Sequence, residues 1–380
     1  MIDPDGILST PISLKELTLL EGVVPLAEPF RSAIGARRER QAVWVRWTDQ
    51  EGDWGVGECS CRPDPYFNGE FVDGALCVLR DYVFPLLPCR GTLRDVAATL
   101  AKVRGWNFTN SAVLDAVFDL MRRKGGTDAL DRWPVVPLTR IPAGISLGLF
   151  ETPEAAVQRV GRADEAGYHR IKMKVAPDMN LDTIAAVRSA FPAVHLGFDA
   201  NGTLTEDDLP FVDTLAAFRP ALFEQPFAPG RIDLSAALKE RRPDLCICLD
   251  ESLDGFGALV SAHRLGALDE VNLKPGRVGG LLEALRIIEY CAEHQLPAWV
   301  GGMFETGIGR AANLRVAARL PAARAHDLSP SRRYFTVDVV RQPVEMDAEG
   351  YIHFDDDRPV VLDEAIMERL FRRQITLTKT

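Results

Sequence analysis

Short apolar runs alternate with amphipathic stretches from about residue 141 onward, and the apolar runs recur about every 25 residues. Runs of this length and spacing are typical of strands in repeated βα units. The expected strands are AGISLG from Ala143, HRIKMKV from His169, VHLGFDA from Val194, ALFEQP from Ala221, CICLDE from Cys246, EVNLK from Glu270, PAWVG from Pro297 and a weaker stretch from Ala325 to Leu328. Seven or eight such units favour a closed parallel barrel, with an open doubly wound sheet as the alternative.

The stretches between these strands carry helix signals. In TPEAAVQRVGRADEAG, residues 152–167, Thr152 can cap the helix N-terminus and Pro153 can occupy its first position. Gly167 is placed to end the helix. The segment therefore predicts one complete connecting helix between two strands.

The two ends of the chain show a different pattern. Alternating runs around a turn, DQEGD from Asp49, indicate antiparallel strands, and helical stretches follow, one of them from Ser111 to Arg123. Strand-like runs and a short helix come after the barrel region. These segments are QAVWVRW from Gln41, WGVGEC from Trp54, FTVDVV from Phe335, GYIHF from Gly350 and the helical DEAIMERL from Asp363. Because the last part is rich in strands, we expect it to return to the N-terminal part.

The composition is that of an ordinary globular protein, with 47% hydrophobic and 26% charged residues among 380. A net charge of -10 argues against binding to nucleic acid or to an anionic membrane surface. No apolar run approaches the roughly 18 residues of a membrane span, and the N-terminus lacks a signal-peptide pattern, so we expect a cytoplasmic protein. Seven cysteines without a CxxC pair indicate reduced thiols rather than a zinc site.

Two familiar motifs occur in contexts that do not suit them. GISLG, residues 144–148, matches a nucleophile elbow, but Leu149 and Phe150 continue the chain where that motif needs an immediate turn into a helix. GIGRAA, residues 307–312, matches a dinucleotide-binding fingerprint but lies late in the chain, not in the first βα turn. We therefore expect neither a nucleophilic Ser146 nor a Rossmann domain.

Charged residues end five successive strands of the predicted barrel. They are Lys174, Asp199, Glu224, Asp250 and Lys274, at intervals of 25, 25, 26 and 24 residues. The carboxyl ends of barrel strands converge on one mouth, where active sites lie. A single charge of this kind is often an ordinary solvated strand end, but five in register indicate a site.

The residue types at this mouth suit metal-dependent proton transfer on a small-molecule substrate. Three carboxylates with no His or Cys among them offer hard oxygen ligands for Mg²⁺ or Mn²⁺. Lys172 and Lys174 precede these carboxylates in strand order and Lys274 follows them, so lysines should approach the substrate from opposite sides.

Lys172 and Lys174 point to the same face of one strand, about 6.6 Å apart. At an effective dielectric near 20 their repulsion is about 2.5 kcal/mol, which lowers one pKa by nearly two units. The pair therefore predicts one lysine that acts as a base nearer neutral pH.

Motifs at these strand ends carry a resemblance to a known family. They are KMK at 172–174, DAN at 199–201, EQP at 224–226, DES at 250–252 and KPG at 274–276. Together they resemble the enolase superfamily in its muconate-lactonizing-enzyme-like subgroup. Three further stretches look most like the o-succinylbenzoate synthases and N-succinylamino acid racemases: GGMFETGIGR from Gly301, HDLSPS from His326 and PLAEPFRSAIG from Pro25.

The resemblance implies an α/β fold, with a modified (β/α)8, TIM-like barrel in residues 131–330. An α+β capping domain would be formed by residues 1–130 together with the C-terminal segment 331–380. The loops around Phe30–Ser32 and Cys59–Phe67 would close over the substrate from this cap.

The same resemblance implies roles for the site residues. Asp199, Glu224 and Asp250 would bind Mg²⁺, with Asn201 and Glu251 close to these ligands. Lys174 would take the proton α to a substrate carboxylate, and Lys172 would help to neutralise the charge that develops. Lys274 would lie against the substrate ring or reprotonate its other face. The substrate pocket would also be lined by Ser146, Gly302 and Met303.

Two activities follow from the resemblance. One is the dehydration of 2-succinyl-6-hydroxy-2,4-cyclohexadiene-1-carboxylate to o-succinylbenzoate, a lyase reaction of menaquinone biosynthesis. The other is the racemisation of N-succinylamino acids, by a separate or a bifunctional enzyme. Dipeptide epimerases of the subgroup carry Asp-x-Asp on the last strand, whereas this chain has Asp327, Leu328 and Ser329, which argues against an epimerase.

A catalytically silent barrel that serves as a binding protein is a third interpretation. The complete set of lysines and carboxylates argues against it, because a protein without the chemistry has no reason to keep them all. The sequence leaves the oligomeric state open, a homo-oligomer included.

Overall fold

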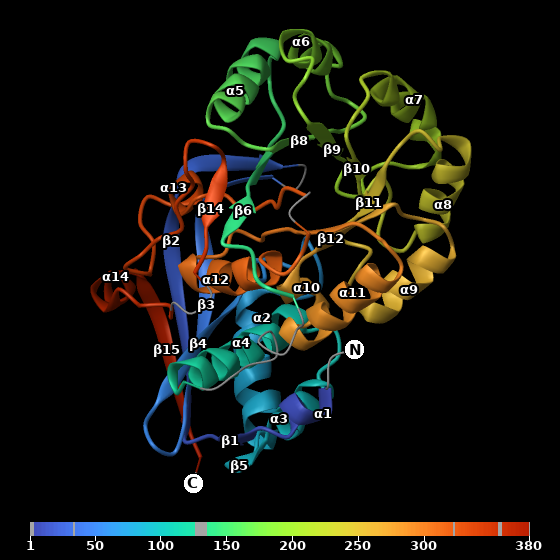
Figure 1. Ribbon diagram of the computed structural model, residues 1–380. Helices are drawn as coiled ribbons and strands as arrows, with labels where there is room; N and C mark the ends of the chain where they lie inside the picture. Colours follow the sequence, from blue (N-terminus) through green and yellow to red (C-terminus); the bar gives the residue numbers. More distant parts are fainter. Residues whose placement is uncertain (1–3, 33–34, 126–134, 322–323, 356–358, 380) are drawn as a thin grey trace.

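The computed structural model describes residues 4–32, 35–125, 135–321, 324–355 and 359–379, with the side chains of residues 4, 5 and 30–36 outside this description. A curled parallel sheet of seven strands lies at its centre, in the order β13-β12-β11-β10-β9-β8-β7 (Figure 1). Its strands are β7 Gly144–Leu147, β8 Arg170–Lys174, β9 Leu196–Asp199, β10 Phe223–Glu224, β11 Ile247–Leu249, β12 Glu270–Leu273 and β13 Ala298–Val300. Each lies within a predicted apolar run, which confirms the predicted α/β class and parallel sheet.

The eighth predicted strand, Ala325 to Leu328, forms only an isolated parallel bridge, between His326 and Ala143. Its backbone nevertheless joins the two edges of the sheet. Gly144 N donates to His326 O at 2.6 Å, and Asp327 N donates to Val300 O at 2.9 Å. The fully buried His326 adds a side-chain bond, because its Nδ1 lies 2.9 Å from Val300 N. This segment, residues 326–327, is the barrel seam.

Helices cover the outer face of the barrel sheet (Figure 1). They are α5 Pro153–Glu165, α6 Asp182–Ala190, α7 Leu209–Ala217 after the 3-10 turn Glu206–Asp208, α8 Ile232–Arg241, α9 Phe256–Arg264, α11 Leu281–Glu293 and α12 Gly307–Ala317. The short α10 Pro275–Val278, which follows β12, packs instead against helix α4 Asn107–Arg123. The predicted ends of α5 are confirmed, since Thr152 Oγ1 accepts from Ala155 N at 3.2 Å and Gly167 has a φ of 85°. Within the described ranges, none of the helices has both the length and the apolar character to cross a membrane.

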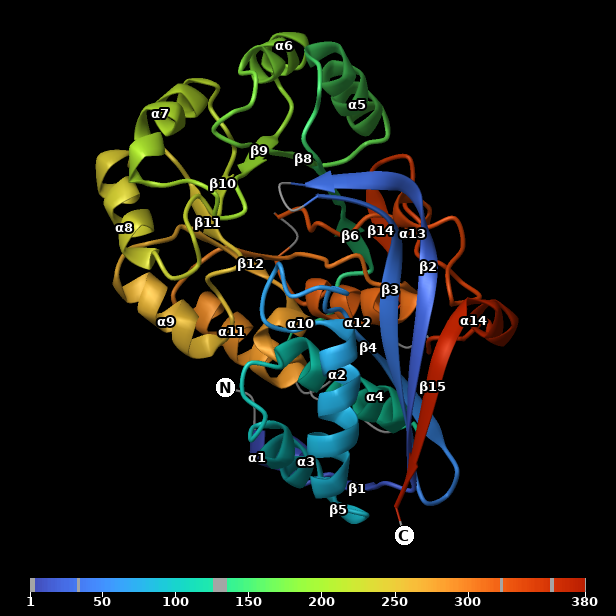
Figure 2. The same ribbon diagram turned by 180° about the vertical axis from the view of Figure 1, so that it is seen from behind.

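An antiparallel sheet in the order β15-β2-β3-β4 stands beside the barrel (Figure 2). Its strands are β2 Glu16–Ser32, β3 Gly35–Thr48, β4 Trp54–Cys59 and β15 Phe371–Thr378. The chain thus returns to its start, because β15 pairs with β2 from Phe371 against Gly22 to Thr378 against Glu16. The far end of the β2–β3 hairpin bends over the barrel towards β8 (Figure 2).

Smaller elements complete this part of the molecule. They are α1 Pro4–Leu8, β1 Pro11–Ser13, α2 Val72–Val78, the π-helical turn Leu79–Val83, the 3-10 turn Phe84–Leu86, β5 Arg90–Thr92, α3 Leu93–Leu100, α4 Asn107–Arg123, β6 Arg140–Pro142, α13 Ser331–Tyr334, β14 Tyr351–His353 and α14 Glu364–Leu370. Helix α4 packs so tightly on β4 that a Cβ at Gly57 would lie 2.1 Å from Ala112 O. Only glycine permits this approach of strand and helix.

A buried carboxylate joins the antiparallel sheet to the barrel. Glu58 on β4 accepts hydrogen bonds from Thr306 N at 3.0 Å, from Thr306 Oγ1 at 2.6 Å and from Gly309 N at 3.0 Å. These donors stand at the N-terminus of α12, where backbone N–H groups have no partner within the helix. The contact therefore fixes β4 against the barrel.

Three expectations for the chain ends need correction. The run FTVDVV is not a strand: Asp338 Oδ1 turns inward to accept from Gly307 N at 2.8 Å, so only Phe335 and Val340 form isolated bridges. The helix expected from Ser111 begins at Asn107, because the Glu70 carboxylate accepts from the backbone N–H groups of its first turn. Strand β15 has no counterpart among the expected strands.

The predicted division into residues 1–130, 131–330 and 331–380 stays a prediction. Its first boundary lies in residues 126–134, outside the described residues.

We expect mild acid to weaken the barrel seam. Burial and the nearby Arg170 lower the pKa of His326 to about 3, so the folded protein holds a neutral imidazole that the unfolded chain protonates near pH 6.5. Because the unfolded state binds the extra proton, the free energy of unfolding should fall by about 2 kcal/mol from pH 7 to pH 5 on this account. Urea denaturation of wild type and His326→Gln at both pH values measures the difference, with the exposed His353→Gln as control. Equal pH slopes for wild type and His326→Gln would contradict this account.

Candidate active site

Parallel pairing brings the charged strand ends into one row. Lys174 pairs in register with Asp199, and Asp199 with Glu224. Asp250 follows β11 and Lys274 follows β12, each at the carboxyl end of its strand. Together they line a cavity of about 330 Å³, a size that suits a small-molecule ligand.

Every site residue predicted from the sequence lines this cavity. These are Ser146, Lys172, Lys174, Asp199, Asn201, Glu224, Asp250, Glu251, Lys274, Gly302 and Met303. Distant segments meet there: Asp327, which also lines the cavity, is bonded to Arg170, 157 positions earlier in the chain.

Lys172 stands at the centre of a buried charge network. Its Nζ lies 2.8 Å from Glu224 Oε2, 2.7 Å from Asp327 Oδ2 and 3.8 Å from Asp199 Oδ2. Asp327 in turn accepts from Arg170 Nη2 at 2.7 Å. All five side chains are less than 10% exposed, so the charges stabilise one another in place of water.

The predicted effect of lysine repulsion is wrong for Lys172. Burial alone lowers its pKa, but the carboxylates of Asp327, Glu224 and Asp199 outweigh burial and raise the pKa well above its usual value. The prediction considered only the neighbouring lysine and omitted these three anions. These ion pairs therefore favour the protonated ammonium form of Lys172.

Lys174 has a different environment. Its side chain is 11% exposed, and its Nζ donates to Asp199 Oδ2 at 3.1 Å and to Asn201 Oδ1. Asn201 also donates through Nδ2 to Glu251 Oε1 at 3.0 Å. Its backbone lies in the left-handed region, with a φ of 46°, and this costly conformation turns the chain sharply just after the strand.

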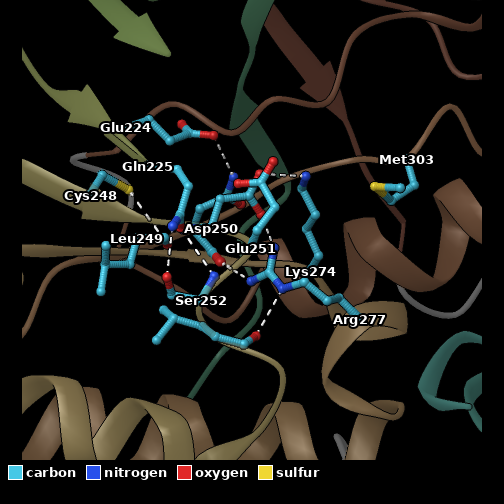
Figure 3. A network of polar contacts seen from close by, with 12 residues as sticks. Glu224, Gln225, Cys248, Leu249, Asp250, Glu251, Ser252, Lys274, Arg277 and Met303 are labelled. Carbon is cyan, nitrogen blue, oxygen red and sulfur yellow. Dashed lines mark hydrogen bonds and ion pairs between the residues drawn. The ribbon is translucent and has the colours of Figure 1, made fainter. Parts of the chain in front are cut away.

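Gln225 holds the ends of two strands together. Its Oε1 accepts from Asp250 N at 3.0 Å and from Ser252 N at 3.1 Å, and its Nε2 donates to Ser252 Oγ at 2.7 Å. Gln225 also has a positive φ, of 36°. A fully buried amide thus sets the position of the Asp250 backbone (Figure 3).

Two cations reach the Asp250 carboxylate (Figure 3). Lys274 Nζ donates to Asp250 Oδ2 at 2.7 Å, and Arg277 Nη1 donates to Oδ1. The guanidinium of Arg277 is anchored by Leu253 O at 2.8 Å from Nε and by Asn272 O at 2.6 Å from Nη2. Arg277 is therefore held rigidly beneath the cavity.

The oxygen ligands of this mouth suit a hard divalent cation. Asp199, Glu224 and Asp250 are at most 3% exposed, and carboxylates are the ligands that Mg²⁺ takes in proteins. Next to Asp250, the buried Oε2 of Glu251 has no hydrogen-bond partner in the described part of the chain.

Across the described ranges, no three His, Cys, Asp or Glu side chains are arranged as a ready metal site. The carboxylates are engaged by Lys172, Lys174 and Lys274 instead. The residues fit a divalent cation by chemistry and position, and its binding requires an exchange of these ion pairs.

The antiparallel sheet and the loop after it supply the other wall of the cavity. This cap wall includes Leu26, Arg37, Glu39, Arg40, Arg62, Tyr66 and Phe67. The ring centroid of Phe67 lies 5.5 Å from Lys274 Nζ. The loop Cys59–Phe67 thus reaches the cavity, whereas the side chains of Phe30–Ser32 lie outside the described residues.

Several residues of the site were missed from the sequence. Arg277 lies three positions after Lys274, one helical turn into α10, and that spacing was its only signal. Asp327 and Gln225 lay within quoted motifs, HDLSPS from His326 and EQP at 224–226, but no role was predicted for either, and Arg170 carried no signal. Their positions depend on contacts between distant segments.

Comparisons with known proteins agree with this geometry. A family model described as Enolase C-terminal domain-like matches residues 154–359. An N-succinylamino acid racemase of Amycolatopsis sp. is 37% identical over 320 residues, covering 83% of this chain and 86% of the relative. An o-succinylbenzoate synthase of Geobacillus kaustophilus is 32% identical over 386 residues, covering 96% of this chain and 99% of the relative.

A solved structure of an enolase superfamily member from Listeria innocua superposes with a TM-score of 0.89 at 28% identity, covering 97% of this chain and 99% of that one. The similarity therefore extends over the cap sheet as well as the barrel. On these matches, the chain is an enzyme that belongs to the enolase superfamily.

Proposed function

We propose that this enzyme is an o-succinylbenzoate synthase of menaquinone biosynthesis that removes the proton α to a carboxylate and then eliminates water. The observation that carries the proposal is the position of Lys174 and Lys274, which line one cavity from β8 and β12 with the carboxylates of the intervening strands between them. N-succinylamino acid racemisation is the second candidate, favoured by the 37% identical relative of that name.

Asp199, Glu224 and Asp250 would hold Mg²⁺, or Mn²⁺ in its place, with Asn201 and Glu251 beside them. When bound, the ion would stabilise the negative charge that develops on the substrate carboxylate as the α-proton leaves. Enolase superfamily sites commonly combine such an ion with a lysine or histidine base.

The charge balance of the barrel mouth supports a substrate with two carboxylates. The cations Arg170, Lys172, Lys174, Lys274 and Arg277 face the carboxylates Asp199, Glu224, Asp250, Glu251 and Asp327. These charges balance one another, so a divalent cation adds two positive charges that a dianionic substrate offsets. Both proposed substrates carry two carboxylates.

The two lysines of β8 would have different roles because their surroundings differ. Lys172 pairs with Asp327, which is not among the proposed metal ligands, so it would keep its proton when the ion binds and could offset negative charge on the substrate. Lys174 is held by one carboxylate and an amide and reaches the cavity, which leaves it as the base that takes the α-proton.

Lys274 would serve the two reactions differently. In the dehydration its positive charge would lie against the substrate ring, an attraction that requires no proton transfer. In the racemisation its Nζ would return a proton to the face opposite Lys174. The same side chain therefore separates the two activities experimentally.

The deciding experiment compares both reactions on the purified protein with Mg²⁺. We expect efficient dehydration of 2-succinyl-6-hydroxy-2,4-cyclohexadiene-1-carboxylate, followed by ultraviolet absorbance. In parallel, N-succinyl amino acids in D₂O report α-deuteration by NMR. Efficient deuteration with negligible dehydration would contradict the synthase proposal and support the racemase candidate.

Substitution of the two lysines should separate their roles. Lys174→Ala should abolish both activities, because each begins with its proton abstraction. Lys274→Arg keeps a positive charge but is a poor acid and base, so it should lower racemisation by at least about 100-fold and spare dehydration more. Steady-state kcat and KM for both substrates measure this, and equal losses of the two activities would count against the ring contact.

Removal of a carboxylate should remove the metal. Calorimetric titration of the metal-free protein with Mg²⁺ should give about one ion per chain, and Glu224→Gln should weaken binding at least about tenfold. The exposed Glu240→Gln on α8 is the matched control, and thermal melting verifies that each variant is folded. Unchanged Mg²⁺ binding by Glu224→Gln would show that the ion sits elsewhere.

A further inference from the structure

Three arginines converge on the cap wall of the cavity. Arg37 and Arg40 come from β3 and Arg62 from the loop after β4, and all three line the same cavity as Lys174. The side chains of Arg37 and Arg62 are 24% and 16% exposed, whereas Arg40 is 4% exposed. We call these three residues the arginine wall.

A single carboxylate orients the two half-buried arginines, Arg37 and Arg62. Asp64 Oδ2 accepts from Arg37 Nη2 at 2.5 Å, and Asp64 Oδ1 accepts from Arg62 Nε at 3.1 Å. Asp64 does not belong to the described lining of the cavity. It therefore holds both guanidinium groups at the cavity without occupying the space in front of them.

The third arginine leaves the wall with a surplus of positive charge. Arg40 Nη1 donates to Cys61 O at 2.6 Å, but its buried Nε and Nη2 have no hydrogen-bond partner among the described residues. No carboxylate of the described ranges forms an ion pair with it. Glu39, which is exposed and also lines the cavity, offsets one charge. Glu58 interacts electrostatically with Arg40, but its carboxylate is turned to the N-terminus of α12 and does not line the cavity, so at the wall three cations face Glu39 and Asp64.

The guanidinium groups also repel one another. Burial, Arg62 and Arg40 each lower the pKa of Arg37, and Asp64 only partly opposes them. An anion placed against the wall would relieve this repulsion. The barrel mouth opposite needs no such anion for its own side chains, because its cations and carboxylates already balance.

We propose that the arginine wall binds a second carboxylate of the substrate, remote from the reacting carbon, through Arg37 and Arg62 with Arg40 reinforcing the charge. A guanidinium presents two parallel N–H groups that match a carboxylate, which gives such a contact both strength and orientation. The inference rests on the proposed function. The second carboxylate can belong to the acyl chain or to an amino acid side chain, and the wall recognises their shared chemistry.

Three N-acylamino acids separate these sources. N-succinyl-L-phenylalanine carries the distal carboxylate on its acyl chain, N-acetyl-L-glutamate carries it on its side chain, and N-acetyl-L-phenylalanine has none. The rate of α-deuterium exchange in D₂O with Mg²⁺ gives kcat and KM for each. The experiment uses wild type, the double variant Arg37→Gln/Arg62→Gln and the conservative double variant Arg37→Lys/Arg62→Lys.

We expect the glutamine double variant to raise KM about tenfold to a hundredfold for the substrate whose distal carboxylate meets the wall. Its kcat should change little, and N-acetyl-L-phenylalanine should be unaffected. The lysine double variant should lower this KM part of the way back to the wild-type value. It restores the positive charge but not the two parallel N–H groups of a guanidinium. Arg38→Gln, an exposed neighbour outside the cavity lining, should match wild type for all three substrates.

Equal effects of the glutamine double variant on all three substrates, or no effect on any, would overturn the inference. Absence of exchange with the wild type would instead refute the racemase candidate, and absence of both exchange and dehydration would refute the proposed function. In that case calorimetric binding of N-succinyl-L-phenylalanine and N-acetyl-L-phenylalanine, with Mg²⁺, to wild type and double variant tests the wall without catalysis. Tighter binding of the succinyl compound by wild type alone would uphold it, and equal binding would refute it.

Discussion

The ammonium group of Lys172, buried among carboxylates from other strands, is the constraint on which the active-site end of this barrel depends. It joins β8 to Glu224 on β10 and to Asp327 in the barrel seam. Taking away one partner of such a group leaves an uncompensated buried charge, at a cost of about 3–5 kcal/mol. The same contacts that prepare the site for chemistry therefore also hold the last segment of the barrel in place.

The two walls of the cavity differ in electrostatic character. The barrel wall is balanced among its own side chains, while the cap wall carries the surplus of its arginines. Glu58 fixes the spacing between the two walls, because it binds the N-terminus of α12 from β4. On the proposed function, a small substrate would lie between a neutral surface that carries the reacting lysines and a positive surface that binds its distal carboxylate. Recognition and reaction can then change independently of each other.

The sequence predicted the local and repetitive features well. Strand ends recur with the length of a βα unit, so the spacing alone places Lys174, Asp199, Glu224, Asp250 and Lys274 at one mouth. The missed features depend on contacts between distant segments. The inward turn of Asp338 removes a strand that its apolar neighbours favour. The high pKa of Lys172 depends in part on Asp327, which lies 155 positions away and whose contact with Lys172 no sequence motif indicated.

The pairing of β15 with β2 has a consequence for synthesis of the protein. The two strands are separated by 338 residues, from 33 to 370. A ribosome that adds about 5–20 residues per second needs about 20–70 s to make that stretch. During this time the outer edge of β2 has no partner from its own chain, and an unpaired edge invites pairing with other chains. The nascent protein therefore passes through a period in which dilution or a chaperone, and not its own fold, protects the sheet that carries the arginine wall.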